Sequence, residues 1–240
     1  MNATIHPPVR ERSYFAQERL EVISLLPRIQ GKAFLDLGCG EGGLGRQLKA
    51  RGSGPVVGIE AEAQAAAEAA RHYDRVYTAD LDRFAPPFAA ESFDHLICAD
   101  ILEHLQDPWS LLARFRPALR LTGTLVASIP NVGNVDTLGQ LLRGRFGYVD
   151  WGVMDQSHLR FFTRHGIEEM FCRAGYVIDE IRPKRDPNAE AILELWRQQE
   201  MARRLRDLTV LLGGAPHLPS DDDLREMLTI QYLVIARRRD

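Results

Sequence analysis

The sequence predicts a single α/β domain, residues 1–240, whose core is a mostly parallel β-sheet. Short buried apolar segments alternate with helical segments along most of the chain, and this alternation is typical of βαβ units. The segment 34–37 breaks directly into a glycine-rich loop that leads into a helix. With 45% hydrophobic and 26% charged residues, a chain of 240 residues can bury one such core and carry insertions.

The expected strands are short apolar runs that end at turn residues. Helical segments follow most of the first strands, and the last two strands lie beyond the regular alternation. The seven expected strands are residues 34–37, 56–60, 76–79, 93–99, 124–129, 176–181 and 229–236.

The expected helices carry start and stop signals. Thr163 is a good N-cap for a helix that Gly175 stops. Pro27 ends an amphipathic pattern over residues 10–26, which predicts a helix in an N-terminal cap, residues 1–30. Further helices are expected over residues 44–50, 61–72 and 108–120.

Two regions depart from this alternation and are expected to be insertions. Residues 131–160, after the fifth strand, form a lid that is rich in Gly and Asn and has one short helix around residues 138–142. Residues 186–228, before the last strand, carry an amphipathic helix over about 189–212 and a second helix capped by Ser220. The second insertion either covers a substrate site or forms a homodimer surface.

Composition and charge narrow the classes of function. The net charge of −3 gives no general attraction to nucleic acid or to anionic membranes. No apolar run approaches the roughly 18 residues of a spanning helix, and the first residues lack the pattern of a signal peptide. Cys39, Cys98 and Cys172 are far apart and odd in number, which is typical of reduced thiols. We therefore expect a cytoplasmic protein with neither a membrane span nor a nucleic-acid partner.

The glycine loop matches a dinucleotide fingerprint, but its acidic residues favour another ligand. Gly38, Gly40 and Gly43 satisfy the spacing G-x-G-x-x-G. A pyrophosphate needs bare backbone N–H groups at the helix N-terminus, and the carboxylates of Asp36 and Glu41 would repel it. These carboxylates would suit a ligand that carries an ammonium and a sulfonium. Glu41 has a second interpretation, in which it only complements the helix dipole.

The sequence around this loop, F-L-D-L-G-C-G-E-G-G, resembles the class I S-adenosylmethionine-dependent methyltransferases. The resemblance covers roughly residues 10–180 and implies a Rossmann-like seven-stranded sheet with helices on both faces and one antiparallel strand near its edge. The methyl donor would lie across the carboxyl ends of the first strands. The motifs I-P-N, residues 129–131, and H-L-R-F-F-T, residues 158–163, are similar to those of a bacterial subgroup, type 11/23-like, that is associated with saccharides and other small acceptors.

The resemblance also implies a set of donor-binding residues. Glu60, at the end of the second strand, would accept hydrogen bonds from both ribose hydroxyls, a role that fits NAD equally well. Asp80 would accept a hydrogen bond from the adenine amino group, and the backbone N–H of Leu81 would reach the adenine ring. Ala61 would lie against the adenine, and Ala99 would pass the methionine end of the donor. The remaining candidates are Asp36, Gly38 and Gly40 in the loop, and Tyr14, which would close over the donor.

The candidate catalytic base is His158. Methyl transfer from a sulfonium is an in-line displacement, for which an oxygen nucleophile usually needs a base. His158 lies at the end of the lid, where it leads into the next helix, and an imidazole titrates near neutrality. The alternative is a structural histidine that fixes the lid through hydrogen bonds.

A metal site would need a different arrangement of ligands. Asp100, Glu103 and His104 crowd two carboxylates and an imidazole together. No second cluster with ligand spacing completes the set, so the sequence predicts no metal.

The expected function is transfer of a methyl group from S-adenosylmethionine to an oxygen or nitrogen of a small acceptor, with S-adenosylhomocysteine as the second product. A saccharide hydroxyl is the first candidate acceptor. The basic and aromatic run 143–148 is first interpreted as a plain part of the lid. The alternative is contact with an acceptor, for which a sugar or a phosphorylated compound is favoured over RNA. Two alternatives remain: an NAD-dependent oxidoreductase that uses the same loop, and a regulatory module that binds S-adenosylmethionine without catalysis.

Overall fold

The computed structural model describes residues 18–211 and 219–239, which divide into two compact units. The first unit comprises the described residues of Met1–Ile129, Ser157–Ile181 and Leu233–Asp240. The second comprises Pro130–Gln156 and the described residues of Arg182–Tyr232. Most of the two insertions expected from the sequence, 131–160 and 186–228, therefore belongs to the second unit.

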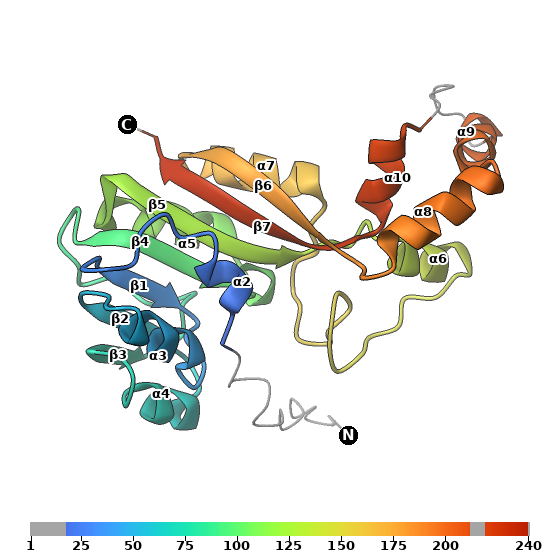
Figure 1. Ribbon diagram of the computed structural model, residues 1–240. Helices are drawn as coiled ribbons and strands as arrows, with labels where there is room; N and C mark the ends of the chain where they lie inside the picture. The colour runs from blue at the N-terminus through green and yellow to red at the C-terminus, as the bar shows by residue number, and fades with distance from the viewer. Residues whose placement is uncertain (1–17, 212–218, 240) are drawn as a thin grey trace, which may run out of the picture. The chain divides into compact units, whose positions relative to one another are not determined.

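In the described residues, seven strands form one sheet (Figure 1). The strands are β1 (Phe34–Leu37), β2 (Val56–Glu60), β3 (Arg75–Thr78), β4 (Phe93–Ala99), β5 (Leu119–Pro130), β6 (Tyr176–Arg185) and β7 (Thr229–Arg238). Their order is β3-β2-β1-β4-β5-β7-β6, and the pairs β1–β2, β1–β4, β2–β3 and β4–β5 are parallel. The arrow of β7 points opposite to those of its neighbours in Figure 1, so the mostly parallel sheet that the sequence predicts is confirmed.

The helices in the described part of the first unit pack against its strands or against one another. They are α2 (Leu20–Ile23), α3 (Gly43–Ala50), α4 (Ala63–Ala69), α5 (Pro108–Phe115) and α7 (Arg164–Arg173), with 3-10 turns η1 (Leu102–His104) and η2 (Arg116–Ala118). Val22 of α2 and Leu48 of α3 are buried in one cluster with Phe34 of β1 and Val56 of β2. This apolar face fixes α3 against the strands, and with it the glycine loop that α3 follows.

Several element boundaries differ from the sequence prediction. The helix expected over 108–120 ends at Phe115, because Pro117 lacks the N–H that a continuing helix needs, and Arg120 lies in β5 instead. The helix expected over 61–72 begins only at Ala63, where the Glu62 side chain caps it. Of the helix expected over 10–26, the described part is the four-residue α2, and the rest up to residue 17 lies outside the described residues.

The described part of the second unit combines helices and strand ends with the loop segment 143–156. Its helices are α6 (Val135–Leu142), α8 (Ala189–Gln198), α9 (Met201–Leu211) and α10 (Asp221–Met227). The single helix expected over 189–212 is two helices, because Glu200 between them adopts a left-handed conformation with φ 52°. The cap expected at Ser220 is confirmed as a capping box with Asp223. No helix in the described ranges is long and apolar enough to cross a membrane.

Candidate active site

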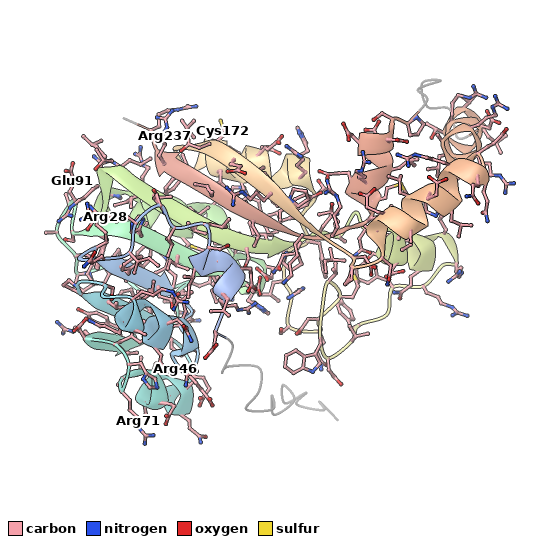
Figure 2. All side chains as sticks on the ribbon, viewed as in Figure 1. Arg28, Arg46, Arg71, Glu91, Cys172 and Arg237 are labelled. Carbon is pink, nitrogen blue, oxygen red and sulfur yellow. The ribbon has the colours of Figure 1, made fainter. Side chains whose placement is uncertain are left out.

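The candidate site lies at the carboxyl ends of the parallel strands of the first unit. Exposed charges such as Arg46, Arg71 and Arg237 project outward from this unit (Figure 2). By contrast, Asp36 of β1 and Glu60 of β2 are buried acids. Buried carboxylates are costly unless they are hydrogen-bonded, so the partners of each show what holds this site together.

The Glu60 carboxylate links β2 to the glycine loop. Its Oε2 accepts the backbone N–H of Gly40 at 2.9 Å, and its Oε1 accepts the N–H of Glu62 at 2.9 Å. Each oxygen keeps a lone pair for a further donor. Ala61, between the two acids, is exposed. The loop and the start of α4 are thus held to the one carboxylate that the sequence singles out at the end of β2.

The glycine loop passes close to the segment that follows β4. Gly38 has φ 81°, a left-handed conformation, and a Cβ built on it would lie 2.7 Å from the Ile101 side chain. Only glycine satisfies both conditions. Cys39 beside it is buried, and burial raises the pKa of its thiol far above the usual range, so this thiol is neutral.

Asp36 has a partner that sequence reasoning missed. The Tyr73 hydroxyl donates to Asp36 Oδ2 at 2.5 Å and accepts the backbone N–H of Gly45 at 3.0 Å. Burial raises the pKa of Asp36 to about 7, and the hydrogen bond from Tyr73 opposes this rise. No local pattern marks Tyr73, which lies in the turn between α4 and β3.

Asp80 and Leu81 follow β3 and form a local turn. Asp80 is exposed, and its Oδ1 accepts the N–H of Asp82 at 3.0 Å. Leu81 is buried, and its carbonyl accepts a hydrogen bond from the Arg114 guanidinium at 2.6 Å. The Asp80 carboxylate therefore remains accessible on a turn that Arg114 anchors from α5.

Asp100, directly after the partly buried Ala99 of β4, is a further acid at the strand ends. It has φ 51°, and its Oδ1 accepts the Ser128 hydroxyl at 2.6 Å. Arg19, just before α2, forms an ion pair with Asp100. The charge of Arg19 also lowers the pKa of Asp36, so this cation faces both acids. Sequence reasoning missed Arg19, which no motif distinguishes from the other arginines.

His158 lies beside Glu103 and His104. Its Nε2 is 3.9 Å from Glu103 Oε1, and both side chains are buried. The backbone carbonyl of Glu103 accepts the N–H groups of Leu159 at 2.8 Å and Arg160 at 3.0 Å, which attaches the H-L-R motif to η1. His104 stacks edge-on against His158, with ring centroids 4.7 Å apart.

Ligand atoms of Glu103, His104 and His158 lie within 4.8 Å of one another. The sequence groups Asp100 with Glu103 and His104, but Asp100 is held by Ser128 and Arg19. His104 Nδ1 lies 3.2 Å from the Ser157 carbonyl, which orients its ring. The three side chains form a compact, mostly buried set in which a proton can pass to an imidazole beside a carboxylate.

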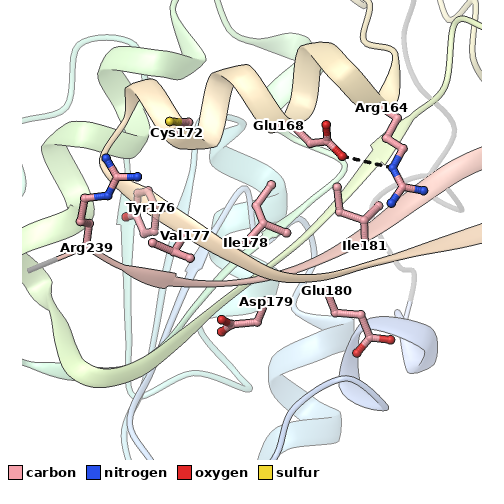
Figure 3. A pocket seen from close by; sticks show the side chains of 10 residues that line it. All are labelled: Arg164, Glu168, Cys172, Tyr176, Val177, Ile178, Asp179, Glu180, Ile181 and Arg239. Atoms are coloured by element: carbon pink, nitrogen blue, oxygen red, sulfur yellow. Dashed lines mark hydrogen bonds and ion pairs between the residues drawn. The ribbon is translucent and has the colours of Figure 1, made fainter.

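A separate open pocket lies between α7 and β6 (Figure 3). It has a volume of about 430 Å³ and includes the exposed Cys172. Arg164 and Glu168 of α7 form an ion pair on its rim. None of the donor or base candidates from the sequence lines this pocket.

The methyltransferase-domain family profile matches residues 9–181. The chain belongs to this family. The match confirms the class I S-adenosylmethionine-dependent methyltransferase resemblance of the sequence, whose expected extent was about 10–180. Membership also decides between the two interpretations of the glycine loop, in favour of S-adenosylmethionine over a dinucleotide.

Two relatives carry the same name, ubiquinone biosynthesis O-methyltransferase. The protein from Aromatoleum aromaticum is 33% identical over 166 residues, covering 62% of this chain and 70% of that protein. The protein from Actinobacillus pleuropneumoniae is 31% identical over 110 residues, covering 42% of this chain. The chain spans about half of that second protein, 47% of its length.

Solved structures share the fold across nearly the whole chain. An S-adenosylmethionine-dependent methyltransferase from Mesorhizobium loti has a TM-score of 0.60 at 19% identity and covers 92% of this chain and 97% of its own. At this identity the likeness shows the fold alone. It agrees with the seven-stranded Rossmann-like sheet expected from the sequence.

Proposed function

We propose that this chain transfers the methyl group of S-adenosylmethionine to an oxygen atom of a small hydroxylated acceptor. The observation that carries the proposal is the buried pair of His158 and Glu103, which adjoins Asp100 at the end of β4 through the short turn η1. A histidine imidazole in the same unit as the acidic strand ends supports the proposed role as proton acceptor. The common name of the two relatives supports oxygen as the methylated atom.

The acidic strand ends fit the charge of the donor. S-adenosylmethionine carries an ammonium and a sulfonium, and Asp36 and Glu60 supply buried carboxylates beside the glycine-rich loop. When bound, the donor supplies an already activated methyl group. Tyr14, proposed from the sequence to close over it, lies outside the described residues. The residues proposed to hold the donor are Asp36, Gly38, Gly40, Glu60, Ala61, Asp80, Leu81 and Ala99.

His158 is proposed to take the proton of the acceptor hydroxyl. The reaction begins with a neutral imidazole that accepts this proton, and the Glu103 carboxylate 3.9 Å away stabilises the imidazolium that results. Leu159 and Arg160 hold the segment to the Glu103 backbone, so the imidazole keeps its position during turnover. Alignment of the acceptor oxygen and exclusion of water supply the rest of the rate.

The first acceptor class that we propose is a saccharide hydroxyl, on the basis of the H-L-R-F-F-T motif.

We also propose that the chain forms a homodimer through α8 and α9. These helices expose Leu195, Leu208, Val210 and Leu211, the last of them by 82%. Large exposed apolar side chains support an interface. Sedimentation velocity at two protein concentrations tests the dimer.

The experiment for the proposed function has two parts. Calorimetry measures binding of S-adenosylmethionine and S-adenosylhomocysteine, with NADH as the control. Methyl-labelled donor is then incubated with a panel of saccharides and hydroxylated aromatic compounds, and labelled products are identified by mass spectrometry. We expect micromolar binding of both sulfur ligands, no binding of NADH, and an O-methylated product. Failure of both sulfur ligands to bind would overturn the donor site.

A further inference from the structure

The Tyr73 hydroxyl connects the two ends of the glycine loop. It donates to Asp36, next to the last residue of β1, and accepts from the N–H of Gly45 in the first turn of α3. The side chain is almost wholly buried, with 7% of the residue exposed. One phenol thus spans the loop from its strand side to its helix side.

The ring of Tyr73 occupies a space that three glycines leave open. A Cβ added at Gly45 would lie 2.0 Å from the ring. A Cβ at Gly58 of β2 would lie 3.1 Å from it, and one at Gly42 of the loop 3.3 Å. Since the backbone approaches the ring from the loop, α3 and β2, the hydroxyl has a fixed position relative to Asp36.

The Asp36 carboxylate is held in an environment that opposes its charge. The pKa of Asp36 is raised to about 7; burial is the largest cause of this rise, and the charge of Glu60 acts in the same direction. The hydrogen bond from Tyr73 and the charge of Arg19 act in the opposite direction. Within residues 18–211 and 219–239, the titratable and charged groups that face Asp36 are Tyr73, Glu60, Arg19, Cys39 and Cys98.

We infer that Tyr73 is a positioning residue for the methyl donor, whose hydroxyl keeps Asp36 oriented and ionised so that the cationic donor meets a carboxylate at neutral pH. Tyr73 acts through Asp36 and through the loop, without touching the donor. The inference rests on the donor site proposed above. It explains why a tyrosine in a turn without any motif is surrounded by glycines from three elements.

The test compares Tyr73→Phe with wild type over pH 6 to 9. Phenylalanine keeps the ring that the glycines enclose and removes only the hydroxyl. Calorimetry with S-adenosylmethionine should show affinity that falls with decreasing pH in both proteins. In Tyr73→Phe the fall should begin at higher pH, with a loss of roughly tenfold at pH 7 that recovers toward pH 9. The KM for the donor should rise at pH 7 while kcat at saturating donor stays near wild type.

Tyr176→Phe is the matched control. The Tyr176 hydroxyl is also buried and donates to the Leu112 carbonyl at 3.1 Å, in the same unit but away from Asp36. This variant should lose a similar amount of thermal stability without moving the pH dependence of donor binding. If Tyr73→Phe does not fold, 3-fluorotyrosine at position 73 keeps the shape and makes the hydroxyl a stronger donor, so the fall in affinity should move to lower pH.

Asp36→Asn separates failure of this inference from failure of the donor site. If Asp36→Asn binds S-adenosylmethionine as wild type does, the donor role of Asp36 is wrong. If Asp36→Asn loses affinity but Tyr73→Phe matches wild type at every pH, only the role of Tyr73 is wrong. Equal weakening of Tyr73→Phe at all pH values would also overturn the inference, since it indicates a structural effect alone.

Discussion

Glu103 Oε1 lies 3.9 Å from His158 Nε2, and both side chains are buried. The two residues come from different elements, the turn after β4 and the segment before α7, and backbone hydrogen bonds join these elements. A carboxylate at this distance favours the protonated form of an imidazole. The pair can therefore take up one proton from an acceptor without leaving an isolated charge in the interior.

Replacement of this imidazole should separate catalysis from donor binding. His158→Gln removes the group that takes the proton, so we expect kcat to fall by about 100- to 10,000-fold. Affinity for S-adenosylmethionine should persist, because His158 is not among the residues proposed to hold the donor. Steady-state kinetics and calorimetry measure the two quantities. His165→Gln, at an exposed position on α7, is the control. Full activity in His158→Gln would show that His158 is not the base and has only a structural role.

Glu60→Gln should weaken donor binding. The Glu60 carboxylate accepts two backbone N–H groups, whereas a glutamine must present its own NH₂ to one of them. The variant also loses the charge that is proposed to face the donor. We expect affinity for S-adenosylmethionine to drop roughly 10- to 100-fold by calorimetry. Glu62→Gln is the control, since its remaining carbonyl oxygen can still cap α4. Equal affinities in the two variants would contradict the role of Glu60.

The sequence predicts the centre of the sheet well, because the signals there are local. The buried strands are short, mostly apolar runs, and a glycine loop after Leu37 marks the turn into α3. The ends of helices are harder to predict where the helical pattern of apolar residues continues across the junction between two helices. The amphipathic pattern from α8 into α9 is one example, since it gives no sign of the left-handed Glu200 that separates the two helices.

Residues of the candidate site can be predicted from the sequence only when they lie at the ends of predicted strands. Asp36 and Glu60 can be found in this way, because the strand and the loop are both visible in the sequence. Tyr73 and Arg19 cannot, because what brings them to Asp36 and Asp100 is tertiary packing between distant segments. Neither residue lies in a motif, and their types are common on any surface.

Gly45→Ala should destabilise the protein, although alanine is the better helix former. The added Cβ would lie 2.0 Å from the Tyr73 ring, which cannot move without breaking its bond to Asp36. We expect a loss of about 1–3 kcal/mol in the free energy of unfolding, against a gain of at most ~1 kcal/mol from helix propensity. Denaturant titration measures the difference. Gly166→Ala on α7 is the control, because its nearest neighbours are 3.8 Å away, and it should be neutral or stabilising.

Asp94→Asn should change how stability depends on pH. Burial would raise the pKa of Asp94, but the N–H of Ala33 and the cations of Lys32 and Arg120 outweigh it and lower the pKa to about 2. Because the folded pKa lies below the unfolded value of about 4, Asp94 stabilises the fold above about pH 4. This contribution is lost as the pH falls from about 4 to 2.

The free energy of unfolding of wild type should therefore decrease over that acidic interval more than it does for Asp94→Asn. At pH 7 the variant should be less stable by about 1–3 kcal/mol, because a charge-assisted hydrogen-bond network at the start of β4 is broken. Urea titrations at a series of pH values measure both effects. Asp207→Asn, exposed on α9, should stay within about 0.5 kcal/mol of wild type at pH 7. Parallel curves for wild type and Asp94→Asn between pH 4 and 2 would show that the Asp94 carboxylate is not held by Lys32 and Arg120 in solution.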